Sequence, residues 1–331
     1  MDPLPHSLER NARDPLAAPA GLSRRTLIRR WGGAAWAVPA ARLLGGCAGG
    51  SSASSPLASA AAAQAAGANW ATGGTARIGA AVRAGNPFLG AAATTCHLTC
   101  EATIGPCHTL SPERSDISDG WDGLPMHMQL RIVDTQCRLI EGAIVEVWHT
   151  NHTGGYSGRI VQMCNNDEAD LDRQFFRGWQ RTGKDGIVRF DSCYPGWYSS
   201  RANHVHLRVM KGGYDPSDSA TAWITTQLLF ADELNTAIFG SAPLYRDKGQ
   251  PDTTLATDNV VGQEPDKSPY LFDVRNVGGV MLASKTLAIR SSLDEAVCRA
   301  RGARPPRRNG GPEGPDGRGL FPGAGKPGSP S

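Results

Sequence analysis

The sequence has no long run with helical periodicity, and outside its N-terminal segment it has no apolar stretch long enough to span a membrane. Short helical turns are expected only near residues 232–239 and 291–300. The first absence excludes a helix bundle as the main architecture. The second excludes a protein whose central region crosses a membrane as helices.

A strong excess of one charge is also lacking, because 34 Lys and Arg residues nearly balance 31 Asp and Glu residues. The basic residues gather at the ends: residues 1–46 carry seven against three acidic residues, and residues 299–331 carry seven against two. The central region is left with 20 basic and 26 acidic residues, a balance of about −6. The net charge therefore gives no support for nucleic-acid binding, and we expect none.

The central region contains a series of short apolar or alternating runs that are separated by turn residues. Connections such as GKDG before Ile187 and CRLIEG before Ala143 are short, as in meanders and Greek keys. This pattern predicts an all-β fold, a single antiparallel β-sandwich domain. Strands are expected at MHMQLRIV (126–133), AIVEVW (143–148), GIVRF (186–190), HVHLRVM (204–210) and ITTQLLF (224–230).

The two ends of the chain differ in composition from the centre. Residues 1–47 contain the paired Arg24 and Arg25 of SRRTLIRRW, followed by a moderately apolar, Ala-rich stretch, which is typical of a twin-arginine export signal; an Arg pair in a basic tail is the alternative. Residues 48–95 are predicted to be a linker, residues 96–298 the sandwich, and the Gly/Pro/Arg-rich residues 299–331 a disordered tail. We therefore expect an exported protein, periplasmic or at the cell surface.

The signal segment ends in a motif that resembles a lipobox, Leu44-Gly45-Gly46-Cys47. Processing there would leave Cys47 as a lipidated N-terminus and would tether the protein to a membrane. Arg42 interrupts the apolar run, so cleavage nearby without lipidation is an equal alternative.

Eight cysteines are many for a reducing compartment and fit an exported protein with disulfides, whose connectivity the sequence leaves open. If Cys47 is lipidated, seven cysteines remain and one has no partner. Cys298, beside the predicted tail, is expected to be that residue. A less favoured alternative is a zinc site formed by Cys96, Cys100, Cys107 and His108.

Two tyrosines and two histidines form the most informative pattern in the chain. His204 and His206 are two residues apart in HVHLRVM, so on a strand both imidazoles leave the same face. Tyr198 lies upstream on a Pro/Gly turn, and Tyr156 ends a Gly-Gly loop after a separate strand. Two phenolates with two neutral imidazoles favour iron(III) over zinc or copper. The alternative is a polar strand face with tyrosines that only pack or hydrogen-bond.

Several motifs, in matching order, resemble those of the intradiol ring-cleavage dioxygenases of the protocatechuate and catechol type. The resemblance runs from Gly105 to Phe230, about two fifths of the chain, and nothing outside this span adds to it. The matching segments are GPCH (105–108), RSDISDGWDGLPMHMQLRIVD (114–134), EGAIVEVWHTNHTGGYSG (141–158), PGWYSSRANHVHLRV (195–209) and TTQLLF (225–230).

The resemblance implies an enzyme that uses Fe(3+) and O2 to open the ring of an o-diphenol between its two hydroxyls, giving a muconate-type diacid. It implies that Tyr156 and His204 are equatorial metal ligands and that Tyr198 and His206 are axial ones. Tyr198 would also be displaced by the substrate and take up one of its protons. No organic cofactor is implied.

Two further residues match positions near the substrate in this family. Arg201 matches the active-site arginine, which would stabilise negative charge that develops on the substrate. Gln227 matches a glutamine that orients the substrate. The resemblance also implies an antiparallel β-sandwich, in agreement with the strand pattern.

The sequence departs from the family pattern beside the expected substrate pocket. Cys107 and His108 stand where the family commonly has two tyrosines, so the identity of the substrate is what they leave open. His149 and His152 are close to Tyr156 in sequence, but the family pattern makes His149 a scaffold residue, and neither is expected to bind metal.

The alternative of a different class is an exported β-sandwich that only binds, with the tyrosines and histidines as a stacking surface for a carbohydrate or another surface ligand. For the enzyme, the expected partners are a small aromatic diol and O2. A membrane tether through Cys47 and a homo-oligomer are further options that the sequence does not decide.

Overall fold

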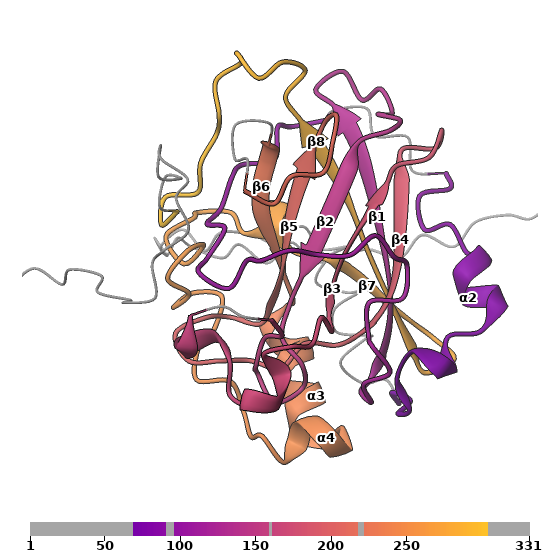
Figure 1. The fold of residues 1–331 in the computed structure, drawn as a ribbon, viewed down its shortest axis with the longest axis vertical. Helices are drawn as coiled ribbons and strands as arrows, with labels where there is room; N and C mark the ends of the chain where they lie inside the picture. Colours follow the sequence, from indigo (N-terminus) through magenta and orange to yellow (C-terminus); the bar gives the residue numbers. More distant parts are fainter. Residues whose placement is uncertain (1–68, 91–95, 159–160, 218–221, 304–331) are drawn as a thin grey trace, which may run out of the picture. The chain divides into compact units, whose positions relative to one another are not determined.

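The structure is a computed structural model that describes residues 69–90, 96–158, 161–217 and 222–303, all within one unit of the chain, Ser51–Ser331. The predicted signal (1–47) and nearly all of the predicted tail lie outside these residues. Two four-stranded sheets pack on each other, in the orders β4-β1-β8-β7 and β3-β2-β5-β6 (Figure 1). The predicted all-β sandwich is confirmed. The strands are β1 (Pro125–Asp134), β2 (Ile144–Trp148), β3 (Arg177–Arg181), β4 (Ile187–Cys193), β5 (His204–Met210), β6 (Ala222–Leu229), β7 (Asp273–Val277) and β8 (Val280–Ile289).

Helices are few and short in the described residues. The longest is α3, a ten-residue helix that replaces the short turn expected near residues 232–239. The turn expected near residues 291–300 forms no helix. No described helix has the length and apolarity needed to cross a membrane. The helical elements are η1 (Gly74–Arg77), α2 (Ala80–Ala84), η2 (Gln162–Cys164), η3 (Glu168–Asp170), α3 (Asp232–Ser241), α4 (Pro243–Arg246) and η4 (Ser268–Tyr270), where η denotes a 3-10 helix.

The core between the sheets is built by strand alternation. Successive side chains of a strand point to opposite faces, so every second residue of β1, β2 and β5 enters the core. The remaining residues of β2 and β5 are buried as well, on the outer face of the second sheet. That outer face is polar and aromatic rather than aliphatic. The core-facing residues are Met126, Met128, Leu130 and Ile132 from β1, Val145 and Val147 from β2, and Val205, Leu207 and Val209 from β5.

Five of the eight strands lie where the sequence predicts them, and β3, β7 and β8 were not predicted. β7 and β8 form a hairpin in which Val277 pairs with Val280 across Gly278 and Gly279. Both glycines have positive φ, 61° and 88°, which is what a tight two-residue hairpin turn requires. β8 then pairs in parallel with β1, so the last strand lies inside the first sheet, between β1 and β7.

Residues 74–84, within the stretch predicted as a linker, form η1 and α2, which pack against the first sheet. Ile78 and Val82 are buried against Val280 of β8. Arg83 Nε lies 2.6 Å from Asp191 Oδ2 of β4. The folded part of the chain therefore includes residues well before Cys96.

Three disulfides cross-link the described residues: Cys96–Cys137, Cys100–Cys298 and Cys107–Cys164. The expectation that Cys298 is unpaired is wrong. The backbone on both sides of the Cys100–Cys298 bond is itself paired, since Glu101 N donates to Cys298 O and Ala300 N donates to Glu101 O. The alternative zinc site is also excluded, because its three cysteines belong to three different disulfides.

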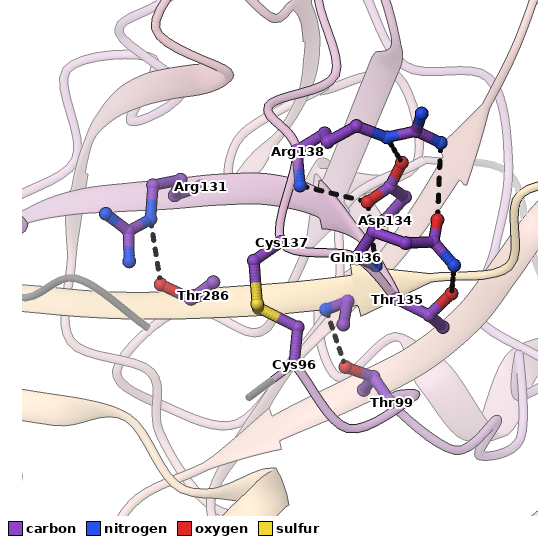
Figure 2. The surroundings of a disulfide bond; sticks show 10 residues. Cys96, Thr99, Arg131, Asp134, Thr135, Gln136, Cys137, Arg138 and Thr286 are labelled. Atoms are coloured by element: carbon purple, nitrogen blue, oxygen red, sulfur yellow. Dashed lines mark hydrogen bonds and ion pairs between the residues drawn. A yellow bond between two sulfur atoms is a disulfide. The ribbon is translucent and has the colours of Figure 1, made fainter. Parts of the chain in front are cut away.

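The Cys96–Cys137 disulfide joins the start of the sandwich to the turn that follows β1 (Figure 2). Asp134 organises this turn, since its Oδ1 accepts from the backbone N–H groups of Gln136 and Arg138. Arg138 Nε also donates to Asp134 Oδ2 at 2.6 Å. The disulfide therefore joins a turn whose conformation is also held by hydrogen bonds.

Cys193, at the end of β4, is the free cysteine of the described residues. Its thiol is buried, and burial together with the charge of Asp122 raises its pKa to about 12. A buried thiol that stays protonated is a poor nucleophile. Cys193 is therefore a core residue without the features of a reactive thiol.

Leu207→Ala tests the core between the sheets. Leu207 is fully buried, so the truncation should lower the free energy of unfolding by about 2–5 kcal/mol, measured by denaturant titration with the disulfides intact. Leu139→Ala, at a position 51% exposed, is the matched control and should change it by less than about 0.5 kcal/mol. Equal losses in the two variants would contradict this description of the core.

Candidate metal centre

A row of four residues crosses the outer face of the second sheet and carries one of the predicted metal ligands. Directly paired residues of neighbouring strands share a face and lie close together. His206 of β5 pairs with Trp148 of β2 on one side and with Gln227 of β6 on the other, and Trp148 pairs in turn with Arg177 of β3. The alternation of four strands thus places these side chains on the same buried surface.

The two histidines of β5 meet through their Nε2 atoms. His204 Nε2 lies 3.0 Å from His206 Nε2 and 3.2 Å from Tyr198 Oη. His204 Nδ1 donates to Ala202 O at 2.7 Å, which fixes its tautomer and leaves a lone pair on Nε2. Trp148 stacks on His206 with ring centroids 5.0 Å apart. Both imidazoles are therefore oriented by neighbours outside the centre.

Two loops bring the tyrosines to the histidines. Tyr198 follows β4 on the Pro/Gly turn, and Tyr156 belongs to the loop between β2 and β3. Tyr156 lies 5.9 Å from Tyr198 and 6.1 Å from His206 between ring centroids. The loops touch at Gly154, where φ is 88° and a side chain would run into the carbonyl of Trp197. All four predicted ligands therefore come together, Tyr156 buried and Tyr198 partly exposed.

Burial controls the protonation of this cluster. Burial, with the cation of Arg201, lowers the pKa of His204 to about 3, and burial with His204 holds the pKa of His206 well below its usual value. Both imidazoles are therefore neutral at pH 7. Burial and the adjacent Tyr198 phenol raise the pKa of Tyr156 well above its usual value, so its phenol keeps its proton unless a cation lies beside it.

A metal ion fits these donors on three observations. The Tyr156 hydroxyl is buried without a hydrogen-bond partner among the described residues. Two imidazole nitrogens approach each other, and neutral imidazoles are the form that binds metal. Tyr198 Oη lies 3.2 Å from His204 Nε2, so a phenol oxygen adjoins the two imidazole nitrogens. Phenolate oxygen is a hard, anionic donor that suits a trivalent ion.

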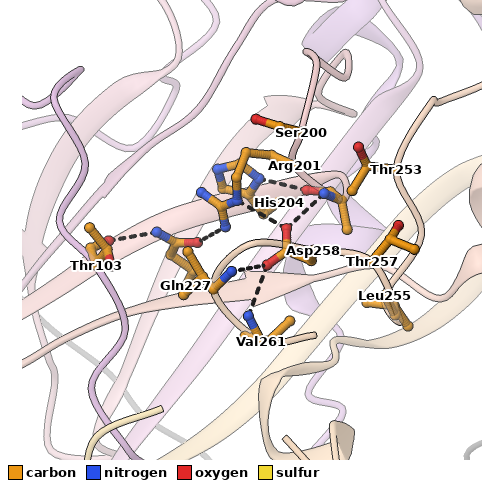
Figure 3. Close-up of polar contacts among 12 residues, drawn as sticks. Thr103, Ser200, Arg201, His204, Gln227, Thr253, Leu255, Thr257, Asp258 and Val261 are labelled. Atoms are coloured by element: carbon orange, nitrogen blue, oxygen red, sulfur yellow. Dashed lines mark hydrogen bonds and ion pairs between the residues drawn. The ribbon is translucent and has the colours of Figure 1, made fainter. Parts of the chain in front are cut away.

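Arg201 and Gln227, the other predicted site residues, form a hydrogen-bonded chain beside His204 (Figure 3). Arg201 donates to the Gln227 side-chain oxygen, and Gln227 Nε2 donates to Thr103 O at 2.5 Å. Arg201 Nε also donates to Asp258 Oδ2 at 2.9 Å. The guanidinium is therefore held from two sides, by β6 and by the loop that contains Asp258.

Asp258 is a site residue that the sequence analysis missed. Its Oδ1 accepts from Val260 N and Val261 N, and its Oδ2 also accepts from Ala202 N. Burial acts to raise the pKa of Asp258, but the Arg201 cation and the backbone N–H groups outweigh it and lower the pKa. Asp258 is 57 positions after Arg201, in a stretch without a motif, so no local signal indicated it.

A second buried charged cluster lies one row further along the same face. Glu146 of β2 pairs with Arg208 of β5, and Arg208 Nη2 lies 3.0 Å from Glu146 Oε2. The same carboxylate accepts from Ser111 Oγ and Tyr214 Oη and contacts His108 Nε2. Burial acts to raise the pKa of Glu146, while His108 and Arg208 lower it. The carboxylate is therefore ionised and fully partnered.

The two residues that depart from the family pattern are both engaged. His108 faces Glu146 and packs edge-on against Trp148, with centroids 4.7 Å apart. Cys107 is bonded to Cys164 and shares an apolar cluster with Tyr156 and Trp148. These residues therefore support the walls of the centre.

His149 and His152 lie outside the centre. His149 Nδ1 donates to Thr150 O, its Nε2 contacts Ser192 Oγ, and its ring stacks on Phe176. Burial lowers the pKa of His149 to about 4. His152 packs against Trp121. His149 is a buried scaffold residue in the structure, as the sequence analysis expects.

A cavity of about 240 Å³ adjoins the row at its β3 end. Arg177 lines this cavity, but none of the four predicted ligands does. It is therefore separate from the space between the tyrosines and histidines. Its other lining residues are Thr109, Leu110, Gly158, Leu171, Asp172, Arg173 and Gln174.

Comparisons with known proteins agree with the motifs. No family model matches the chain. The chlorocatechol 1,2-dioxygenase of Cupriavidus pinatubonensis is 27% identical over 139 residues, which cover 37% of this chain and 49% of that protein. The enzyme of the same name from Rhodococcus opacus is 28% identical over 116 residues, which cover 29% and 40%. The chain thus spans about half the length of these curated relatives, or less.

Among solved structures, an intradiol ring-cleavage dioxygenase from Tetranychus urticae is 25% identical, with a TM-score of 0.50. The similarity covers 59% of this chain and 95% of that one. The chain is thus similar to intradiol ring-cleavage dioxygenases in its ordered motifs and in its sandwich fold.

Asp258→Asn tests the pair that holds Arg201. The change leaves the buried guanidinium without its counter-charge, so the free energy of unfolding at pH 7 should fall by about 3 kcal/mol. Because the folded pKa of Asp258 is lowered, the carboxylate stabilises the fold above about pH 4 and loses that effect as the pH falls through the folded value. The difference between wild type and variant should therefore narrow below pH 4, measured by denaturant titration at several pH values.

Asp247→Asn is the control for this experiment. Asp247 and Arg246 form an ion pair at 3.6 Å with both side chains mostly exposed, so its loss should not measurably change stability at any pH. A difference in the free energy of unfolding between wild type and Asp258→Asn that stays constant down to pH 2 would contradict an ionised buried pair.

Proposed function

We propose that the protein is a non-haem iron(III) dioxygenase that uses O2 to open a catechol-type o-diphenol between its two hydroxyls, giving a muconate-type diacid. The observation that carries this proposal is the meeting of Tyr156, Tyr198, His204 and His206 on one buried face. The similarity to intradiol ring-cleavage dioxygenases supports ring cleavage in general. The donor set of two phenols and two neutral imidazoles supports Fe(3+).

The four side chains would hold Fe(3+). The two phenols differ in exposure and would therefore have different roles. When bound, Fe(3+) supplies Lewis acidity, which favours the dianion of the diphenol and makes its ring reactive toward O2. Tyr156 is 1% exposed and has the role of a permanent ligand. Tyr198 is partly exposed, so an incoming substrate reaches it first. As a phenolate, Tyr198 would take up one of the two protons that the diphenol loses, and water would take up the other.

Arg201 supplies positive charge beside the reacting ring. Asp258 and Gln227 fix its guanidinium before substrate arrives, so no reorganisation is needed as negative charge develops. Gln227 uses both ends of its amide, one on Arg201 and one on Thr103 O. It therefore orients the substrate through Arg201 and through the segment that begins at Thr103.

The substrate ring is proposed at the level of the catechol class. The relatives named chlorocatechol 1,2-dioxygenase support a small diol, and protocatechuate and hydroxyquinol are the other rings to test. Gly105 lies against His206, because a side chain there would meet His206 Cε1 at 3.1 Å. The segment around Gly105 is therefore the wall that selects the ring.

The alternative of a surface that only binds a carbohydrate has less support. A stacking platform needs exposed rings. Tyr156, His204 and His206 are each no more than 3% exposed. Their burial supports a ligand role inside the protein.

We also propose that the protein is exported through the twin-arginine-type segment, with or without a lipid on Cys47. Three disulfides support an oxidising destination. The signal and Cys47 lie outside the described residues, so the proposal depends on their sequence alone.

Iron binding is tested with Tyr156→Phe. Purified wild-type protein loaded with iron should bind about one ion per chain and show a visible tyrosinate-to-iron charge-transfer band that changes when catechol is added. Tyr156→Phe should lower the bound iron and shift the band, measured by metal analysis and absorption spectra. Tyr270→Phe is the matched control, since its hydroxyl is also buried and unpartnered among the described residues, and it should keep both. A colourless, iron-loaded wild type would contradict the proposed site.

Turnover is tested with Arg201→Ala in an oxygen-uptake assay with catechol, protocatechuate and hydroxyquinol. The variant should keep its iron but lose turnover by about 100-fold or more, because the charge opposite the developing anion is gone. Arg189→Ala, which removes a surface arginine paired with Asp185, should retain both properties. Unchanged turnover in Arg201→Ala would remove Arg201 from the mechanism.

A further inference from the structure

The Cys107–Cys164 disulfide joins two segments that each support a different metal ligand. Cys107 belongs to the segment Gly105–His108, which lies against His206. Cys164 belongs to the loop that carries Tyr156. The two cysteines are 57 positions apart in the sequence, and neither is a ligand.

On the Tyr156 side, a backbone hydrogen bond links the tyrosine directly to one cysteine of the disulfide. Tyr156 N donates to Cys164 O at 2.8 Å, and Asn165 Nδ2 donates to Tyr156 O at 3.1 Å. The described part of the loop, residues 149–158 and 161–176, contains no strand and only the short helices η2 and η3. No strand ladder therefore holds Tyr156, and its own backbone N–H and C=O both bond to the segment around Cys164.

On the His206 side, the contacts are apolar and close. Gly105 has a φ of 77° and so little room that a side chain would meet His206 Cε1 at 3.1 Å. Cys107 and Cys164 pack in one cluster with Trp148 and Tyr156. Trp148 in turn stacks on His206 with an interplanar angle of 7°. The disulfide thus bridges the walls on both sides of the centre.

We propose that the Cys107–Cys164 disulfide is a positioning element of the metal centre, which holds Tyr156 in place opposite His206 only in the oxidised chain. The identity of the metal rests on the proposed function, but the positioning of Tyr156 does not. Reduction by a dithiol breaks the Sγ–Sγ bond. The dithiol gives up two electrons and two protons, both cysteines become thiols, and the reductant becomes a disulfide.

The other two disulfides do not share this role. Cys96–Cys137 lies at the turn after β1, beside Asp134 and Arg138 (Figure 2). Cys100–Cys298 lies beside the pair of Glu101 and Arg299. Neither contacts a predicted ligand in the described hydrogen bonds and apolar clusters. Cys96–Cys137 spans 41 positions, similar to the 57 of Cys107–Cys164, and is a matched control for the loss of one cross-link.

The first experiment measures hydrogen exchange in metal-free protein. The double variant Cys107→Ser/Cys164→Ser should exchange the amide of Tyr156 and its neighbours at least tenfold faster than wild type, because the Tyr156 N–H loses its fixed acceptor. Cys96→Ser/Cys137→Ser should leave this peptide within twofold of wild type. Equal exchange of the Tyr156 peptide in wild type and Cys107→Ser/Cys164→Ser, or equal acceleration in both double variants, would overturn the proposal.

The second experiment measures iron retention with iron alone as the probe. Each protein is loaded with ferrous ion in air and passed over a desalting column with a chelator. Cys107→Ser/Cys164→Ser should lose iron at least tenfold faster than Cys96→Ser/Cys137→Ser, and a similar rate in both would count against the positioning role. If wild type binds no iron, the proposed function fails, and hydrogen exchange still decides the positioning of Tyr156.

A variant that does not fold is replaced by wild-type protein treated with a phosphine reductant while metal-free, with the opened disulfides identified by mass spectrometry. Exchange at the Tyr156 peptide should rise in step with opening of Cys107–Cys164, and not with opening of Cys96–Cys137. A rise that follows Cys96–Cys137 would overturn the proposal.

Discussion

The Nε2 atoms of His204 and His206 lie 3.0 Å apart inside the protein, and this contact limits the charge that the surrounding cluster can carry. Two protonated rings could not share this space, because like charges repel strongly where water is excluded. At most one ring could therefore carry a charge, and burial favours the neutral form of both by lowering both pKa values. His204 Nδ1 donates its hydrogen to Ala202 O, and Trp148 fixes the plane of His206. His204 Nε2 therefore offers a lone pair to a cation, and His206 Nε2 offers a second one when the His206 proton is on Nδ1.

Two buried ion pairs near the two histidines orient the side chains around them. Replacing buried ion pairs with apolar residues is often neutral or stabilising, so the pairs Glu146–Arg208 and Arg201–Asp258 are weak grounds for stability alone. Each carboxylate accepts several hydrogen bonds from different segments of the chain. Asp258 thereby joins its own loop to Arg201, and Glu146 joins β2 and β5 to His108. We infer that these pairs fix the geometry of the face on which the ligands lie.

The sequence predicted the strands that carry the site better than the strands that close the sandwich. β5 and β6 are recognisable because apolar residues alternate with the His and Gln residues of the motifs. β3 reads RGWQR, with one large apolar residue, and β7 is five residues long, so neither has a clear period of two. β8 is apolar enough, but its pairing with β1 is parallel and spans most of the domain. Pairings of that range depend on tertiary packing, which local patterns do not contain.

The same limit explains the residues assigned wrongly or missed. Cys298 looked unpaired because it stands next to a tail-like composition, whereas its partner, Cys100, is 198 positions away. Cys193 looked like any other cysteine, and only its position in the core sets it apart. Tyr156, Tyr198, His204 and His206 were found because a short motif surrounds each of them. Asp258 has no such motif, although it holds Arg201 as firmly as Gln227 does.

The proposed export route and the proposed role of Cys107–Cys164 bear on each other. A twin-arginine-type signal moves folded chains, which would allow iron to enter in the cytoplasm, where thiols stay reduced. If the disulfide holds Tyr156, a chain folded in that compartment has three well-oriented donors, since His204, His206 and Tyr198 depend on β5 and on the Asp252 and Gly249 contacts of their own turn. The fourth donor becomes fixed only after oxidation. Iron that entered early would therefore be held loosely until export, and tight binding would coincide with arrival in the oxidising compartment.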